Sequence, residues 1–210
     1  MSNDKHLKQP QHLVYLHGLN SNEHAQKGQL LDDYCQKHHS HITVHRPNLN
    51  LSPDKAIQKL QTLINQYPNI GMVGSSLGGF YANLLVNLTG KKAVLLNPSI
   101  DSGNSLKRFF ADDFDSLPND YVGHTTPDGW QITKSDIHWL MANRPTTSSY
   151  PQNLLVIVKK GDELLNYQET VDYFSQQGVD KHQLIIEEGG DHRMSDFDTK
   201  LAQVVQFLFG

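Results

Sequence analysis

A serine lies between two glycines in the middle of this chain, in a pattern that proteins use to activate a hydroxyl group. Gly74, Ser76 and Gly78 match Gly-x-Ser-x-Gly, a turn that lifts a nucleophilic serine above the end of a strand. The residues two before and two after the serine come close together and must lack bulk, which glycine provides. The pattern predicts that Ser76 is the nucleophile of an acyl-transfer reaction.

A serine hydroxyl is a weak nucleophile until a base removes its proton, and a histidine oriented by a carboxylate supplies that base. Around this kind of turn the three residues follow in the order serine, acid, histidine. Asp162 and His192 have this order, and we predict them as acid and base. Glu163 is the alternative acid. Asp191 is expected to be a turn residue, because it cannot easily orient the ring of its own sequence neighbour.

The chain contains 12 histidines, and those other than His192 are expected to have different roles. His17 follows an early strand and is expected to shape the loop there. A group near Cys35 lacks the usual spacing of metal ligands and is predicted to be solvated surface: His38, His39, His41 and His45. Others lie in the polar tail or away from strand ends: His6, His124, His138 and His182. We therefore expect neither a metal nor a cofactor.

Two backbone N–H groups should stabilise the negative charge that develops on a carbonyl oxygen under attack. One is expected from Leu77, the residue after the nucleophile. The other should come from the loop after the first strand, with Leu19 preferred and Asn20 as the alternative.

The elements that must position these residues are six apolar strands that alternate with helices. We expect strands at 12–18, 41–46, 70–73, 92–97, 153–159 and 183–187, and helices at 25–37, 52–67, 77–88, 165–177 and 196–209. This alternation is typical of an α/β protein with a mostly parallel sheet covered by helices on both faces. Ligands of such sheets bind beyond the carboxyl ends of the strands, which is where the predicted site residues fall.

The stretch from 100 to 150 interrupts the alternation. It is rich in aromatic residues, namely Phe109, Phe110, Phe114, Tyr121, Trp130 and Trp139. An insertion at this point should lie over the carboxyl edge of the sheet as a cap or lid. The alternative is a packed subdomain that does not contact substrate. The whole chain, 1–210, is expected to be one domain.

Composition excludes several other classes of protein. The chain has 37% hydrophobic and 19% charged residues and a formal net charge of −4. Its basic pairs, Lys91-Lys92 and Lys159-Lys160, do not extend into a run that indicates nucleic-acid binding. The single cysteine, Cys35, excludes an intrachain disulfide and fits a reducing compartment. The polar stretch 1–11 is unlike a secretory signal, and no apolar run reaches the ~20 residues of a membrane span, so a cytoplasmic location is expected.

Several motifs resemble those of the YqiA/YcfP family of small bacterial α/β-hydrolases. They are Leu-His-Gly-Leu-Asn-Ser at 16–21, Val-Gly-Ser-Ser-Leu-Gly-Gly-Phe-Tyr-Ala at 73–82, Leu-Asn-Pro at 96–98, Gly-Asp-Glu at 161–163 and Glu-Gly-Gly-Asp-His at 188–192. The resemblance runs from about residue 12 to the C-terminus. It implies a single-domain esterase of the α/β-hydrolase fold without a metal, acting on acyl esters or acyl-CoA thioesters. By this resemblance Ser76 matches the nucleophile, Asp162 the acid and His192 the base.

The sequence therefore favours a serine hydrolase that cleaves a small-molecule acyl ester through an acyl-enzyme on Ser76. One alternative is an acyl-CoA thioesterase or acyltransferase, in which Lys107, Arg108 or Arg193 contacts the phosphates of CoA. Another is a scaffold of the same fold that binds a partner without catalysis. The acyl chain, the leaving group and the oligomeric state stay open.

Overall fold

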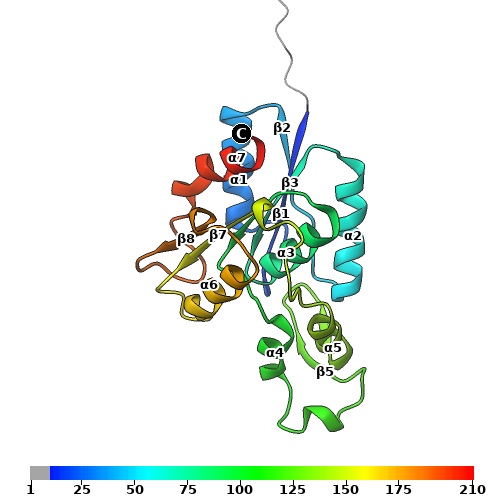
Figure 1. Cartoon of the computed structure of the whole chain (residues 1–210). Helices are drawn as coiled ribbons and strands as arrows, with labels where there is room; N and C mark the ends of the chain where they lie inside the picture. The colour runs from blue at the N-terminus through cyan, green and yellow to red at the C-terminus, as the bar shows by residue number, and fades with distance from the viewer. Residues whose placement is uncertain (1–9) are drawn as a thin grey trace, which may run out of the picture.

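A six-stranded sheet forms the centre of the computed structural model, which describes residues 10–210 (Figure 1). The strand order is β2-β1-β3-β4-β7-β8, and every neighbouring pair is parallel. The strands are β1 (Gln11–Leu16), β2 (Ile42–His45), β3 (Ile70–Ser75), β4 (Ala93–Leu96), β7 (Leu154–Lys159) and β8 (Leu184–Glu187). The predicted parallel sheet is confirmed. Its strand ends differ from the predicted ones by two residues at most.

Helices cover both faces of this sheet because the buried strand residues alternate between two apolar clusters. Leu13 and Tyr15 of β1 belong to the cluster that contains α1 (Gln26–His38) and α7 (Leu201–Phe209). Val14 and Leu16 belong to the other cluster, together with α2 (Pro53–Gln66), α3 (Leu77–Thr89) and α6 (Tyr167–Gln176). Such two-sided burial is what near-continuous apolar strands require.

The ends of two helices show how well the local sequence predicted where a helix begins. Pro53 occupies the first turn of α2, as its fixed φ favours. Ser52 precedes it, but its hydroxyl donates to Asp54 Oδ1 at 2.5 Å rather than capping the helix. The last helix was expected from 196. It begins at Leu201, after the 3₁₀ turn η5 (Phe197–Lys200). No helix within residues 10–210 is long and apolar enough to cross a bilayer.

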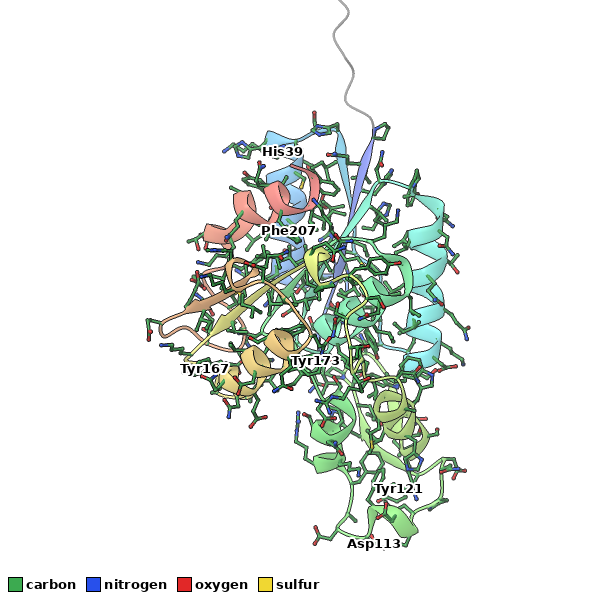
Figure 2. All side chains as sticks on the ribbon, viewed as in Figure 1. His39, Asp113, Tyr121, Tyr167, Tyr173 and Phe207 are labelled. Carbon is green, nitrogen blue, oxygen red and sulfur yellow. The ribbon has the colours of Figure 1, made fainter. Side chains whose placement is uncertain are left out.

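Between β4 and β7 the chain leaves the sheet and forms a projecting segment beyond the carboxyl ends of the strands (Figure 1). It contains α4 (Ser102–Leu106), η1 (Lys107–Phe109), η2 (Phe114–Ser116), β5 (Val122–Thr125), β6 (Gln131–Thr133) and α5 (Lys134–Ala142). The chain then returns to the amino end of β7 through η3 (Pro151–Asn153), where Asn153 donates to the carbonyl oxygen of Gly90. Figure 2 places Asp113 and Tyr121 at the end of this segment farthest from the sheet.

The projecting segment is held to the scaffold by apolar and polar contacts. Trp130, Ile137 and Leu140 join the cluster beneath α2 and α3. In the turn after β5, Asp128 Oδ2 accepts a hydrogen bond from the side-chain amide of Asn22 at 3.1 Å. The β5–β6 hairpin was not predicted, because its two strands are only four and three residues long and lack a clear alternation of apolar residues.

A buried lysine fixes the end of β7 to the segment that follows His192. The side chain of Lys159 is 4% exposed, and its Nζ lies 2.5 Å from both Glu187 Oε2 and Asp196 Oδ2. The hydrogen bond from Lys159 lowers the pKa of Asp196. Glu187 ends β8 and Asp196 precedes η5, so one cation joins three parts of the chain.

Replacing Lys159 with methionine should lower the free energy of unfolding by about 2 kcal/mol, because Glu187 and Asp196 lose the more buried of the two lysines that they share and keep only Lys200. Urea denaturation measures the change. The matched control is Lys160→Met, which removes an ion pair with Glu188, a side chain that is 83% exposed. Exposed pairs contribute about 0–1 kcal/mol, so the control should stay near the wild type. Equal losses in both variants would contradict this role of Lys159.

Candidate active site

Ser76 occupies a strained turn between β3 and α3. Its backbone has φ 55° and ψ −119°, a conformation that residues other than glycine rarely adopt. A Cβ on Gly74 would lie 2.3 Å from the carbonyl oxygen of Gly78, and a Cβ on Gly78 would lie 2.0 Å from that of Leu16. The two glycines are therefore required sterically, as their spacing in the sequence indicated.

Three side chains that are distant in the sequence meet beside this turn. His192 Nε2 lies 3.0 Å from Ser76 Oγ, and His192 Nδ1 lies 2.8 Å from Asp162 Oδ2. The side chains of His192 and Asp162 are 13% and 3% exposed. A ring that contacts a carboxylate through Nδ1 presents Nε2 as an acceptor to the hydroxyl, which is the arrangement of a general base.

The acidic residues around His192 have separate partners. Asp162 Oδ1 also accepts hydrogen bonds from the N–H groups of Leu164 and Leu165, at 2.8 and 2.9 Å. Glu163 Oε2 accepts from the backbone N–H of His192 at 2.9 Å and does not contact its ring. Asp191 Oδ2 accepts a hydrogen bond from the hydroxyl of Ser195 at 2.6 Å, and this contact closes a turn. The geometry therefore favours Asp162 over Glu163 as the acid.

Asn97 is a buried residue of this site to which the sequence analysis assigned no role. It follows β4 with a positive φ of 41°, and its side-chain amide donates to the carbonyl oxygens of Asp191 and His192, at 3.0 and 3.2 Å. Its Oδ1 accepts from the N–H of Lys159 at 2.9 Å. One amide thus ties the histidine loop to the ends of β4 and β7. The signal available in the sequence was an asparagine directly after a buried strand, where its side chain tolerates left-handed backbone.

The loop after β1 passes directly over the nucleophile. A Cβ on Gly18 would lie 3.1 Å from Ser76 Cβ and 3.7 Å from Ser76 Oγ. Leu19 and Leu77 line the same cavity as Ser76. Leu77 begins α3, where backbone N–H groups have no partner inside the helix. Asn20 does not line the cavity, and its Oδ1 lies 3.2 Å from His124 Nε2.

His17 supports this loop from below. It is buried, its Nδ1 lies 2.9 Å from the carbonyl oxygen of Gly18, and its Nε2 accepts from the N–H of Leu49 at 2.9 Å. Both ring nitrogens are used, and only the neutral ring with a proton on Nδ1 satisfies both bonds. Burial lowers the pKa of His17. The placement agrees with the expectation that His17 shapes the loop.

The side chains of the site enclose a cavity of about 240 Å³. The loop 163–165 and the projecting segment both contribute to its lining. The complete lining is Leu19, Ser76, Leu77, Ser99, Ser102, Ser105, Leu106, Arg108, Glu163, Leu164, Leu165 and His192. A wider groove of about 560 Å³ lies beside β2 and α2 and contains none of the predicted site residues. The smaller cavity is the candidate site because it holds the nucleophile and the base.

Comparison with family models places the chain in a known group. Residues 12–209 match the model of UPF0227, described as an uncharacterised protein family. The chain belongs to this family. The resemblance to YqiA/YcfP proteins is thereby confirmed.

Solved structures similar to this member of the family are α/β-hydrolases. Est1E from Butyrivibrio proteoclasticus has a TM-score of 0.72 at 14% identity, covering 98% of this chain and 89% of that chain. A structure of Est1E with ferulic acid bound gives the same TM-score and identity, covering 95% and 88%. The esterase Pf2001 from Pyrococcus furiosus has a TM-score of 0.61 at 15% identity, covering 97% and 84%. The predicted α/β-hydrolase fold is confirmed, and at these identities the likeness carries the fold alone.

Replacing Asn97 with alanine should lower kcat on an activated phenyl ester by about 10–100-fold, because a small displacement of the histidine loop costs that much. KM should change by less than about threefold, since Asn97 does not line the cavity. The control is Asn83→Ala, which removes a buried asparagine whose amide contacts Tyr173 at 3.3 Å, away from the histidine loop. The proposed positioning role fails if Asn97→Ala retains wild-type kcat, or if Asn83→Ala loses as much.

The buried His17 should make stability depend on pH. Its folded pKa lies below the ordinary 6.5, so the unfolded chain binds more protons as the pH falls and the folded state loses stability. Glutamine at 17 stays neutral and retains a donor and an acceptor. Between about pH 7.5 and 5, the free energy of unfolding of the wild type should therefore fall by about 1 kcal/mol more than that of His17→Gln. Parallel pH profiles in urea denaturation would rule this out.

Proposed function

We propose that this protein is a serine hydrolase that cleaves a small acyl ester through an acyl-enzyme on Ser76. The observation that carries the proposal is the contact of His192 Nε2 with Ser76 Oγ at 3.0 Å, with Asp162 on the other ring nitrogen. Two features support it: the strained turn that exposes the serine, and a cavity that contains both serine and imidazole.

In the first half of the reaction, Ser76 Oγ attacks the ester carbonyl carbon while its proton moves to His192 Nε2. The carbonyl oxygen becomes negatively charged and accepts hydrogen bonds from the N–H groups of Leu77 and Leu19. Asp162 holds the ring tautomer and stabilises the imidazolium. His192 then gives its proton to the leaving alcohol as the C–O bond breaks, and the acyl group stays on Ser76.

Water completes the cycle by the same route. His192 removes a proton from water, the hydroxide attacks the acyl-enzyme, and the proton returns to Ser76 Oγ as the acid leaves. No metal takes part in this scheme. Est1E, which shares the fold, has been solved with ferulic acid bound, and a small ester is the substrate class that we propose for this chain.

The segment 100–150 acts as a cap over the site in this proposal. Ser102, Ser105, Leu106 and Arg108 all come from it and line the cavity of the nucleophile. Of the basic residues considered for CoA, Arg108 alone is part of that lining, whereas Lys107 lies over the ring of Phe114 at 4.9 Å. These contacts favour the interpretation as a substrate-contacting cap over that of a separate subdomain.

A fluorophosphonate probe tests the proposed nucleophile. We expect covalent labelling of the wild type at Ser76, located by mass spectrometry, and loss of labelling in Ser76→Ala. Turnover of an activated ester should fall by about 10³-fold or more in that variant. Ser75→Ala is the control, because the adjacent serine belongs to β3 and does not line the cavity. Absence of an adduct on Ser76 would instead favour a binding protein with this fold.

A further inference from the structure

The wall of the cavity formed by the projecting segment is unexpectedly polar. Ser99, Ser102 and Ser105 all contribute to it. Ser102 Oγ donates to Ser99 Oγ at 2.8 Å, and these two residues are 2% and 7% exposed. The Ser99 hydroxyl therefore keeps a proton to donate within the cavity. An esterase site for a purely apolar acyl chain gains nothing from buried hydroxyl groups, because they must stay hydrogen-bonded.

Arg108 ends this polar wall and has no acidic partner. Its Nη1 donates to the carbonyl oxygen of Ser105 at 2.7 Å, and its guanidinium lies 4.8 Å from the centre of the Phe109 ring. Phe109 also stacks on His124, with ring centres 4.3 Å apart. Within residues 10–210 no carboxylate lies within 4.0 Å of this guanidinium. Arg108 is exposed, and its guanidinium is positioned by one carbonyl and one aromatic ring, which leaves further N–H donors for a ligand.

One carboxylate, that of Glu163, also lines the cavity. Its Oε2 accepts a hydrogen bond from the backbone N–H of His192, which holds this side chain at the histidine loop. The next two residues of the lining, Leu164 and Leu165, are apolar. The lining therefore combines Arg108 and three serine hydroxyls from one segment with Glu163 and two leucines from another, around Ser76 and His192.

We infer that the substrate is an ester that carries a carboxylate or similar anionic group, and that Arg108 binds this group while Ser99 donates to its neighbouring polar atoms. Arg108 is the specificity-determining residue. A guanidinium without an ion pair in the lining of a cavity attracts a carboxylate through charge-assisted hydrogen bonds. This inference rests on the proposed hydrolysis at Ser76 and adds the chemical class of its substrate. The anion lies on the acyl side or on the leaving-group side of the ester.

Two matched pairs of esters separate these positions. Phenyl hydrogen adipate and phenyl hexanoate have the same number of acyl carbons and differ by a carboxylate on the acyl side. Para-acetoxybenzoate and para-acetoxybenzamide differ by a carboxylate on the leaving group. In one of the pairs, kcat/KM should be about tenfold higher for the anionic ester, the effect of one charge-assisted hydrogen bond. The pair that shows the preference identifies whether Arg108 binds the acyl side or the leaving-group side of the ester.

Two variants test the residue itself. Arg108→Gln should abolish the preference, measured within each variant as the ratio of kcat/KM for the anionic and the neutral ester of a pair. Lys107→Gln is the matched control, since it removes a neighbouring cation that does not line the cavity, and it should keep the preference. Arg108→Lys retains the positive charge and should keep part of the preference for the anionic ester. In the wild type, the preference for the anionic ester should decrease at high ionic strength, because salt screens the attraction between Arg108 and the carboxylate.

The inference is overturned if the wild type hydrolyses the neutral member of both pairs as well as the anionic one, or if Arg108→Gln retains the preference. Either result leaves the proposed function standing, provided that Ser76 is still required for turnover. If none of the four esters is hydrolysed and Ser76 is not labelled by the fluorophosphonate, it is the proposed function that fails.

Discussion

The backbone at Ser76 is the constraint on which the candidate site depends. A positive φ at a residue other than glycine costs on the order of 1–3 kcal/mol, and the surrounding structure must hold it. Glycines at 74 and 78 leave room for the turn. The carbonyl oxygen of Ser76 accepts from the N–H groups of Gly79 and Ser99, and its own N–H donates to Leu96. The hydroxyl is therefore fixed above the sheet before any substrate arrives, which is the preorganisation that covalent catalysis needs.

The histidine side of the site is secured by buried polar groups rather than by secondary structure. The loop that carries His192 connects β8 to η5, and two separate anchors reach it. The amide of Asn97 bonds to its carbonyl oxygens, and Lys159 joins Asp196 just beyond it to the ends of β7 and β8. Buried polar networks of this kind are costly unless every member is paired, so they specify one position of the loop. The same sheet edge thus supplies both the rigid turn and the anchored base.

The projecting segment and the scaffold are in contact at the loop that is proposed to stabilise the oxyanion. Asn20 in this loop contacts His124 of β5, and Asn22 contacts Asp128 in the turn that follows. His17 fixes the same loop from the scaffold side. Arg108 belongs to the same arrangement through the stacked rings of Phe109 and His124. Residues proposed to recognise substrate and residues proposed to stabilise charge are therefore held by one set of contacts.

The amino-acid order was sufficient for the parallel sheet, its alternating helices and the family, because strand hydrophobicity and the Gly-x-Ser-x-Gly turn are local signals. It also proposed Ser76, Asp162 and His192, whose side chains the fold brings together and whose catalytic roles stay a prediction. The roles of Asn97, Lys159 and Arg108 did not follow from the sequence. Each depends on partners in other segments of the chain or on a cavity lining built from separate segments. Local patterns carry no information on such partners, so three-dimensional packing decided which polar residues anchor the site and which charge faces the substrate.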